Sequence, residues 1–150
     1  MRFRLILNGA LALILTLSTN LHAVTHEIIV YKTPACGCCR IWVNHIKANG
    51  FQVTVKEVAS TLEYQKKYGA PEKLSSCHTA IVEGYTIEGH VPASEILRLL
   101  KERPKAKGLA VPGMPLGSPG MESGGRSERY QVLLFQEDGR TSVYKEYPAR

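Results

Sequence analysis

Beyond its first 23 residues the chain lacks an apolar run long enough to cross a bilayer. The one candidate, residues 5–17, follows Arg2 and Arg4 and precedes Ala23, a small residue at a plausible cleavage point. This order is typical of a secretory signal peptide. We therefore expect residues 1–23 to be removed and the mature protein to reside in the periplasm, without stable membrane insertion. The alternative, an uncleaved anchor, is disfavoured by the shortness of the apolar run.

The chain also lacks the features of a nucleic-acid-binding protein. Its formal charge of +6 falls to +4 when Arg2 and Arg4 leave with the signal peptide, because each carries one positive charge. The remaining cations concentrate only at Lys66-Lys67 and between residues 101 and 107, and no groove-reading motif with interleaved aromatic residues accompanies them. Cations near a helix C-terminus interact favourably with the helix dipole. We expect a solvated helix surface and no nucleic-acid partner.

Cysteine is scarce, and its spacing argues against the usual pair of structural disulfides. The four cysteines are Cys36, Cys38, Cys39 and Cys77. Neighbours in sequence are poorly placed for a disulfide, so only Cys36–Cys39, or a bond from one of these three to Cys77, has acceptable geometry. Three thiols within four residues instead indicate a soft-metal or redox site.

The hydrophobic pattern predicts alternating strands and helices over residues 24–103. Strands are expected at 26–31, 51–58, 79–82 and 86–91, and helices at 38–49, 60–68 and 93–103. A capping box, Ser60-Thr61-Leu62-Glu63, opens the second helix, and Leu97 is among the apolar residues expected on the inner side of the third. The order βαβαββα predicts an α/β sandwich.

The remaining residues, 104–150, have a different composition and are expected to form a C-terminal extension. Residues 104–129 are rich in Pro, Gly and Ser. A loop of this length in a compact domain is either functional or disordered. Residues 130–135 and 141–147 then alternate around Asp138-Gly139, which predicts a β-hairpin with its turn at these two residues.

The three clustered cysteines are predicted to lie between the first strand and the first helix. The N–H groups and dipole of a helix N-terminus favour thiolate over thiol, and Gly37 is expected to allow a tight turn there. Thiolates both bind metals and attack disulfides, so placement alone does not decide the function. Dithiol redox chemistry needs only Cys36 and Cys39, whereas Cys38 adds nothing to that mechanism.

The third thiol therefore favours a metal site. Thiolates select Cu(I) and zinc, and adjacent thiolates can bridge several ions, which makes a multi-copper cluster chemically reasonable. A structural zinc site is usually built from two separated ligand pairs, and the cysteine spacing fits that less well. Cys77 precedes the third strand, whose start is expected beside the clustered cysteines, so it is the candidate fourth thiolate.

Histidines and methionines extend the list of candidate ligands. His78 is the weaker neighbour of Cys77, and His90 and His45 are better explained by packing or capping than by metal binding. Met114 and Met121 lie in the Pro/Gly-rich loop rather than on a helical stripe, which weakens the usual core-filling explanation. Thioethers are soft ligands for Cu(I), so a loop folded over the cysteines would bring them to the metal, with Glu122 as a further neighbour.

Five stretches of the chain together resemble the copper-resistance CopG family, a periplasmic metal-binding family long labelled as of unknown function. They are Cys36-Gly37-Cys38-Cys39, Cys77-His78-Thr79, Gly89-His90-Val91-Pro92, Gly108-Leu109-Ala110-Val111-Pro112-Gly113-Met114-Pro115 and Gly117-Ser118-Pro119-Gly120-Met121-Glu122. The resemblance covers essentially the whole mature chain. It implies a thioredoxin-like domain with a C-terminal extension that helps bind metal, and copper bound at Cys36, Cys38 and Cys39. It also implies copper handling beside efflux systems, with interconversion of Cu(I) and Cu(II).

The leading hypothesis is thus a periplasmic copper-binding protein for copper resistance. The predicted metal ligands are Cys36, Cys38, Cys39, Cys77, His78, Met114 and Met121. The expected partners are copper ions and a periplasmic efflux system or copper chaperone, and the chain is expected to be a monomer. Two alternatives remain: a thiol–disulfide oxidoreductase that uses Cys36 and Cys39, and a structural zinc module.

Overall fold

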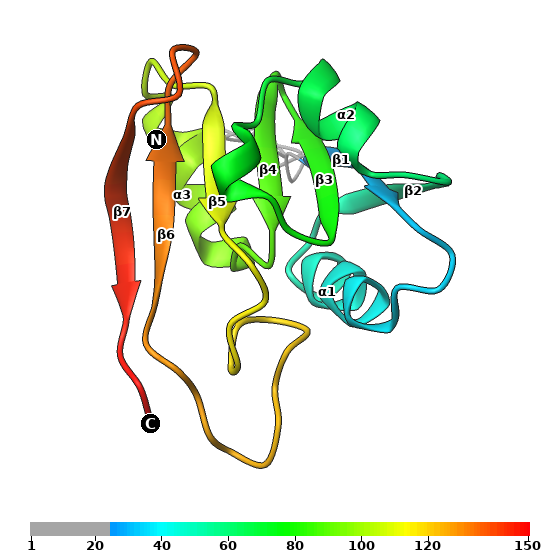
Figure 1. Ribbon diagram of the computed structural model, residues 1–150, viewed down its shortest axis with the longest axis vertical. Helices are drawn as coiled ribbons and strands as arrows, with labels where there is room; N and C mark the ends of the chain where they lie inside the picture. Colours follow the sequence, from blue (N-terminus) through cyan, green and yellow to red (C-terminus); the bar gives the residue numbers. More distant parts are fainter. Residues whose placement is uncertain (1–24) are drawn as a thin grey trace, which may run out of the picture.

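One seven-stranded sheet runs through the molecule in the order β2-β1-β3-β4-β5-β6-β7 (Figure 1). The computed structural model describes residues 25–150, so the predicted signal peptide, residues 1–23, lies outside the described residues. No helix among residues 25–150 is long and apolar enough to span a membrane. The fold is therefore a mixed α/β arrangement built on a single sheet.

The elements up to α3 follow the predicted order βαβαββα, with one added 3-10 turn. All the elements of the described residues, in chain order, are β1 (Glu27–Lys32), α1 (Gly37–Ala48), β2 (Gln52–Glu57), α2 (Leu62–Lys67), η1 (Glu72–Leu74), β3 (His78–Val82), β4 (Tyr85–Gly89), α3 (Ala93–Glu102), β5 (Gly108–Val111), β6 (Tyr130–Phe135) and β7 (Thr141–Tyr147). The predicted terminal hairpin is confirmed as β6 and β7, which pair antiparallel.

The C-terminal strands continue the sheet, which the sequence pattern did not predict. β5 lies within the stretch predicted to be a loop, and it pairs parallel with β4 and antiparallel with β6. All four residues of β5 are buried. A four-residue apolar segment followed by Pro112 is too short to identify as a strand from periodicity. Its pairing with β4 and β6 supplies the hydrogen bonds that stabilise it.

Three local predictions are wrong. The N-cap of α2 is Thr61 rather than Ser60, and its side chain makes no capping hydrogen bond. Leu97, expected on the inner side of α3, is 38% exposed. The alternation of apolar and polar residues over 51–58 predicts a half-buried strand, but β2 is an edge strand and Val55 is 38% exposed.

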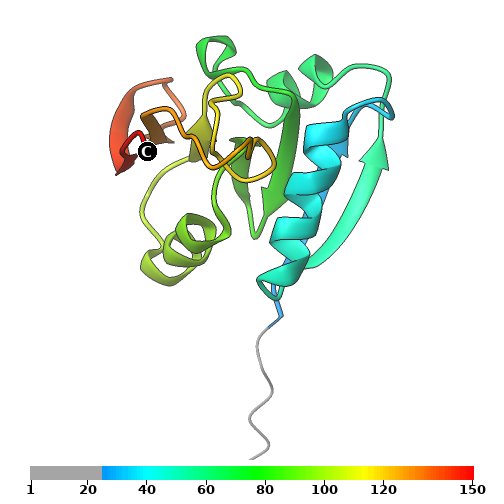
Figure 2. The same ribbon diagram turned by 90° about the horizontal axis from the view of Figure 1, so that it is seen from below.

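The main core lies between the sheet and the two longer helices, α1 and α3, which cover the same face (Figure 2). Trp42 and Ile46 of α1 and Ile96 and Leu99 of α3 are fully buried against residues from β1, β3, β4, β5 and β6. A smaller core on the other face lies under the segment around η1 and includes Leu74 and Phe135. Burial of these apolar side chains supplies the main driving force for folding.

Strand pairing brings several chain segments to one edge of the sheet. Because β1 and β3 are antiparallel, Lys32 at the end of β1 pairs with His78 at the start of β3. β4 is antiparallel to β3, and β5 is parallel to β4, so both of these strands also end at this edge. The segments after β1, before β3, after β4 and after β5 therefore meet there.

Candidate metal centre

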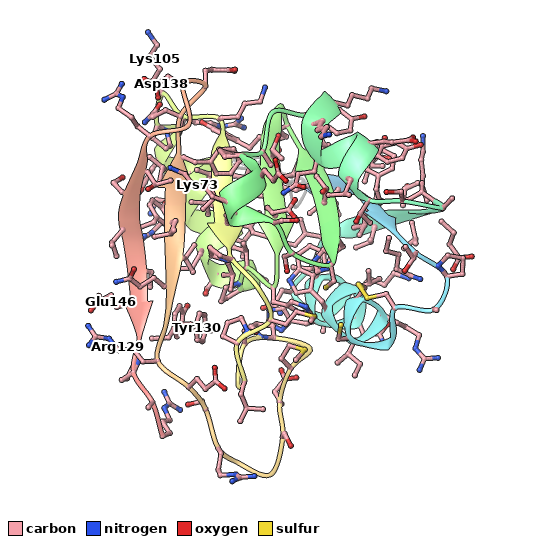
Figure 3. The ribbon with its side chains drawn as sticks, in the orientation of Figure 1. Lys73, Lys105, Arg129, Tyr130, Asp138 and Glu146 are labelled. Carbon is pink, nitrogen blue, oxygen red and sulfur yellow. A yellow bond between two sulfur atoms is a disulfide. The ribbon has the colours of Figure 1, made fainter. Side chains whose placement is uncertain are left out.

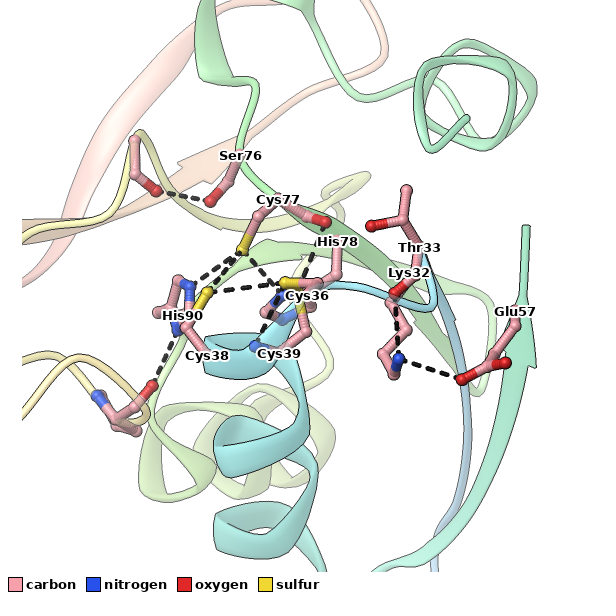
Figure 4. Close-up of a disulfide and its surroundings, with 12 residues drawn as sticks. Lys32, Thr33, Cys36, Cys38, Cys39, Glu57, Ser76, Cys77, His78 and His90 are labelled. Carbon is pink, nitrogen blue, oxygen red and sulfur yellow. Dashed lines mark hydrogen bonds and ion pairs between the residues drawn. A yellow bond between two sulfur atoms is a disulfide. The ribbon is translucent and has the colours of Figure 1, made fainter. Parts of the chain in front are cut away.

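The cysteine turn, residues 36–39, forms the start of α1 (Figure 4). Cys36 is the N-cap, and its sulfur accepts a hydrogen bond from the Cys39 backbone N–H at 3.3 Å. A disulfide joins Cys36 to Cys39, with their Cα atoms 5.4 Å apart. The helix N-terminal position predicted from the sequence is confirmed. Gly37 is not needed for a tight turn, because its φ is not positive and a Cβ added there would have no neighbour within 4 Å.

Cys38 connects this turn to Cys77. Its Sγ lies 3.5 Å from Cys36 Sγ and 3.8 Å from Cys77 Sγ, and both Cys38 and Cys77 are free thiols. One sulfur from each of the four cysteines lies within 4.8 Å of the others. The predicted adjacency of Cys77 to the cysteine turn is therefore confirmed, and the four residues are close enough to hold a metal ion together.

Cys77 is a neutral thiol in the metal-free protein. Burial raises the pKa of its thiol to about 12, and the nearby Cys38 adds to the increase through charge and hydrogen bonding. A hydrogen bond with Ser76 opposes this effect only in part. Metals bind the thiolate, so metal binding at Cys77 must release a proton.

His90 faces the same cysteine, although the sequence analysis favoured a packing or capping role for it. Its Nε2 lies 3.0 Å from Cys77 Sγ. Its Nδ1 lies 2.8 Å from the carbonyl oxygen of Pro119, which can only accept, so Nδ1 carries the proton. Burial lowers the pKa of His90, which keeps the ring neutral and leaves the Nε2 lone pair directed at the thiol. A carbonyl that orients a histidine in this way is typical of metal sites.

His78 completes a second group of donors. Its ring is fully buried, with its centroid 4.3 Å from that of Trp42 and 5.0 Å from that of His90. Its Nδ1 lies 3.4 Å from Cys77 Sγ. Burial, reinforced by the nearby His90 imidazole, lowers the pKa of His78 to about 3. Cys77, His78 and His90 thus form a group of possible ligands within 4.8 Å that shares Cys77 with the cysteine group.

His45, by contrast, makes a hydrogen bond that joins two helices. Its Nε2 accepts a hydrogen bond from the backbone N–H of Ala93 at 3.1 Å. Ala93 is the first residue of α3, whose N-cap Pro92 has no side-chain cap. The histidine of α1 therefore satisfies a free N–H at the start of α3.

Glu88 holds the Cys77-His78 segment from beneath, a role that sequence reasoning missed. Its carboxylate accepts hydrogen bonds from the Ser76 backbone N–H at 2.8 Å and from the Thr79 hydroxyl at 2.7 Å. These two residues flank Cys77 and His78. Burial raises the pKa of Glu88 to about 7, against the two hydrogen bonds. The available signal in the sequence was a single acidic residue within the predicted strand 86–91.

The Pro/Gly-rich loop covers the site. Gly120 has a φ of +90°, and a Cβ added there would lie 2.8 Å from the Cys38 carbonyl oxygen and 3.0 Å from the backbone nitrogen of Trp42. Only glycine fits such a close approach with a positive φ. Glu122 fastens the loop at this point, because its carboxylate accepts a hydrogen bond from the Gly120 N–H at 2.8 Å.

The two loop methionines occupy flanking positions. Met114 follows Gly113, whose N–H donates to the Ser75 carbonyl and whose carbonyl accepts from the Ser76 hydroxyl. Its side chain is 52% exposed. Met121, which is half-buried, follows Gly120 on the side of Cys38. The backbone therefore brings Met114 near the Cys77 side and Met121 near the Cys38 side.

Comparisons with known proteins identify the family. The chain matches two solved structures titled "Copper resistance protein copG", forms 2 and 1. Form 2 is 46% identical, with a TM-score of 0.79 over 83% of this chain and 99% of that chain. Form 1 is 47% identical, with a TM-score of 0.77 over 81% and 97%. This chain belongs to the CopG family of copper-resistance proteins. The resemblance noted from the five motifs is thereby confirmed.

The chain was also compared with protein-family models and with curated proteins. Residues 74–121 match a family described as "Protein of unknown function, DUF411". This span begins in η1, includes Cys77, His78, His90 and both loop methionines, and leaves out the cysteine turn. A comparison with curated proteins found no match.

The donor set of this CopG-family site suits a soft metal, but its capacity depends on oxidation state. Four sulfurs and two imidazoles converge, and thiolate and imidazole both bind copper. The sulfurs of Cys36 and Cys39 are joined in a disulfide and are not thiolates. Only Cys38 and Cys77 are then free to bind as thiolates. Reduction of the disulfide by two electrons makes all four cysteines available.

Proposed function

We propose that this protein binds copper in the periplasm and contributes to copper resistance. The observation that carries the proposal is the convergence of Cys36, Cys38, Cys39 and Cys77 at one sheet edge, with sulfurs within 4.8 Å of one another. The similarity to solved copper-resistance proteins supports copper over other soft metals. Copper is the cargo of this site, and the four cysteines are its principal ligands.

The reduced site is proposed to hold several Cu(I) ions. Cu(I) prefers soft thiolate and thioether donors, and sulfurs as close as Cys38 and Cys77, 3.8 Å apart, can bridge neighbouring ions. Met114 and Met121 supply thioethers from the two flanking ends of the loop. His78 and His90 supply imidazole nitrogens next to Cys77.

Interconversion of Cu(I) and Cu(II) is a further part of the proposal. Imidazole tolerates Cu(II) better than thioether does, so the group Cys77, His78 and His90 provides a setting in which both oxidation states can be held. The cysteine turn favours Cu(I) when it is reduced. Two donor groups that share one cysteine allow an electron to be lost or gained without transfer of copper to a new site.

The setting of this function follows from the export signal expected in residues 1–23. We propose a mature monomer with a thioredoxin-like core, an arrangement that the order β1-α1-β2-α2-β3-β4-α3 supports. Residues 104–150 act as a C-terminal extension that completes the metal site. Copper is received from, or passed to, a periplasmic efflux system or copper chaperone.

A thiol–disulfide oxidoreductase is the second candidate function. It is favoured by the Cys36–Cys39 disulfide at a helix N-terminus, which is the arrangement of dithiol redox enzymes. This function predicts disulfide reductase activity without metal and indifference to the loss of Cys38.

Metal analysis of the full chain, in oxidised and reduced forms, tests the proposed function. Protein is purified from the periplasm, and one half is treated anaerobically with a phosphine, which reduces disulfides without binding as a thiol. Both halves are titrated with Cu(I) against a chromogenic chelator. We expect several copper ions per reduced chain and fewer per oxidised chain, because the disulfide removes two thiolates.

Three results would contradict the proposal. Equal copper binding by both forms would show that Cys36 and Cys39 are not ligands. Zinc as the metal that co-purifies, with no tight Cu(I) binding after reduction, would favour the structural zinc module. Metal-independent reductase activity that survives Cys38→Ser would favour the oxidoreductase.

A further inference from the structure

A groove lies beside the cysteine turn, and Cys36 is the one proposed copper ligand among the described residues that line it. It is a cavity of about 480 Å³ between α1 and β2, and Cys36 lines one end of it. Val43 of α1 and Val55 of β2 contribute apolar surface. The groove lies on the side of the disulfide away from Cys77 and His90 (Figure 4), where Lys32 and Glu57 are seen beside Cys36. It therefore gives access to the disulfide from outside the metal site.

The groove carries a net positive charge. Lys32 is neutralised by Glu57, whose carboxylate lies 3.3 Å from its Nζ. Arg40 and Lys47 also line the groove, both are exposed, and neither forms a salt bridge within residues 25–150. They lie seven residues apart on α1, which places them on one face, separated by about 10 Å along the helix axis. Two unpaired cations on one wall favour a ligand with two separated negative charges.

The disulfide presents a different sulfur to each side. Cys39 is fully buried, whereas Cys36 is half-buried and lines the groove. An attacking thiolate in the groove therefore meets Cys36 Sγ, and Cys39 is the leaving group. Once reduced, the Cys39 thiol can donate to the Cys77 carbonyl, which lies 3.5 Å from its sulfur. This contact stabilises the product of the first step.

We propose that this groove binds a small anionic thiol, of the class of glutathione, and that this thiol reduces the Cys36–Cys39 disulfide. The two carboxylates of this small molecule form ion pairs with Arg40 and Lys47, and its sulfur reaches Cys36. The inference rests on the proposed function, because reduction frees two of the four thiolates that copper requires. It adds the source of the electrons and the place where that source binds.

The reaction balances in two steps. The first thiolate attacks Cys36 Sγ, a mixed disulfide forms, and Cys39 leaves as a thiolate that takes up a proton. A second thiolate attacks the sulfur of the bound small thiol, which releases the small-molecule disulfide and leaves Cys36 as a thiolate. Two small thiols are oxidised to one disulfide, and one protein disulfide is reduced to two thiols. The freed Cys39 thiolate competes with the second small thiol, because its attack on Cys36 Sγ expels the bound thiol and re-forms the Cys36–Cys39 disulfide without net reduction.

The test compares two thiols of opposite charge on the metal-free, oxidised full chain. Glutathione carries two carboxylates and one ammonium group, whereas cysteamine carries only an ammonium group. At matched thiolate concentration, samples are quenched by alkylation, and the fraction of reduced chain is measured by mass spectrometry. We expect the double variant Arg40→Gln/Lys47→Gln to slow reduction by glutathione about fivefold, as the loss of two exposed charge pairs predicts, and to leave cysteamine unchanged or faster.

A matched variant separates the groove from the general field of the protein. Lys73→Gln/Lys105→Gln removes the same charge from two exposed lysines that lie away from the disulfide (Figure 3). It is expected to leave the glutathione rate unchanged. The difference between the two double variants is expected to shrink as salt is raised, because the contacts are exposed.

Three results would overturn the inference. Equal slowing by the two double variants would indicate a long-range charge effect rather than a binding groove. Equal slowing of glutathione and cysteamine by Arg40→Gln/Lys47→Gln would indicate damage to the disulfide environment. Wild-type reduction by glutathione no faster than by cysteamine, with rapid reduction only by a dithiol protein, would assign the disulfide to a protein partner.

The proposed copper-binding function is tested independently of the proposed thiol-binding groove. Cu(I) binding is measured after reduction with a phosphine, which does not need the groove, and Arg40→Gln/Lys47→Gln is expected to bind copper like the wild type. Loss of copper binding by the phosphine-reduced wild type would refute the proposed function and leave the thiol kinetics unaffected.

Discussion

The two sides of the metal centre differ in burial and in whether their donor atoms can change oxidation state. The cysteine turn, residues 36–39, lies at the start of a helix beside an open groove, and two of its three sulfurs are joined in a disulfide. The opposite side, Cys77 with His78 and His90, is set among buried side chains and held by Glu88 beneath and Pro119 above. One side can change its oxidation state, while the other keeps its donor atoms in place.

This difference explains how a small site can be both reactive and ordered. The outer sulfur of the disulfide, that of Cys36, is only half-buried, as the proposed reduction by a small thiol requires. Imidazoles that must stay neutral and oriented benefit from burial, because a low dielectric disfavours the imidazolium. The following predictions test the division of roles, beginning with the largest expected effect.

Loss of Cys38 is expected to have the largest effect, because this residue links the two sides. In Cys38→Ser, Cu(I) affinity of the phosphine-reduced protein is expected to fall by more than about 100-fold, since even outer residues of metal sites cost up to that factor. A chelator competition measures it. Ala35→Ser, an exposed position just outside the turn, is the control and is expected to bind normally. Full stoichiometry and affinity in Cys38→Ser would remove Cys38 from the site.

Replacement of His90 tests the buried side alone. In His90→Asn, the amide nitrogen can still donate to the Pro119 carbonyl, but the Nε2 lone pair facing Cys77 is lost. We expect copper affinity to fall by about 10- to 100-fold, with the fold retained by circular dichroism.

His45→Asn is the matched control for His90. It removes the hydrogen bond to Ala93 at the start of α3 and is expected to lower stability by about 1 kcal/mol, as the loss of a helix cap does. Its copper affinity is expected to be unchanged. Equal copper affinities in the two variants would show that His90 serves packing, as the sequence suggested.

Acid is expected to destabilise the buried side of the metal-free protein. The pKa of His78 is lowered from 6.5 to about 3, so the unfolded chain binds a proton at a pH where the folded chain does not. The stability due to neutral His78 is present above pH 6.5 and is lost as pH falls toward 3, at about 1.4 kcal/mol per unit. Because Glu88 titrates over the same range with the opposite effect, the contribution of His78 is measured as a difference: from pH 7 to pH 5, urea unfolding of the wild type is expected to lose about 2 kcal/mol relative to a His78→Phe variant. His78→Phe keeps an aromatic ring beside Trp42 and removes this contribution.

The effect of Glu88 on the pH dependence of stability is opposite to that of His78, so Glu88 provides the control. Its pKa is raised from 4.5 to about 7, so its contribution is present below pH 4.5 and is lost as pH rises toward 7. Glu88→Gln is therefore expected to lose stability more steeply on acidification than the wild type. A pH dependence unchanged by both substitutions would mean that neither group is as buried as described.

The contact between the loop and the cysteine turn is expected to give the smallest effect. Gly120→Ala places a methyl group against the Cys38 carbonyl, whereas Gly125→Ala, with φ +74°, has no neighbour within 4 Å. Both substitutions strain a left-handed residue, so the difference in unfolding free energy isolates the close approach. We expect Gly120→Ala to cost about 1 kcal/mol more than Gly125→Ala. Equal costs would show that the loop does not pack tightly on α1.

Much of the fold was predictable from local pattern. Strand and helix positions up to α3 and the terminal hairpin follow from apolar periodicity and from turn residues such as Asp138-Gly139. β5 was not predictable, because four residues carry too little periodicity and are stabilised by strands on both sides. The failed capping box at Ser60 shows that a local motif is only one of several ways to start a helix.

The residues of the candidate site likewise fall into those that could be predicted from the sequence and those that could not. The cysteine turn was visible because three thiols lie within four residues, and Cys77 was visible because it precedes a strand. His90 was underestimated because its role depends on Pro119, 29 residues away, which accepts from Nδ1 and so directs Nε2 toward Cys77. No pattern along the chain encodes which carbonyl a histidine will meet.

The sequence by itself determined the chemistry: four thiols, two imidazoles and two thioethers, with the cysteine turn at a helix start. The tertiary structure decided which of these donors meet. The pairing of Lys32 with His78 across antiparallel strands sets Cys77 beside Cys38, and the antiparallel β3–β4 pair brings His90 to the same edge. The physical reason is that side-chain chemistry is a property of each residue, whereas proximity between distant residues arises from strand register and the burial of a shared core.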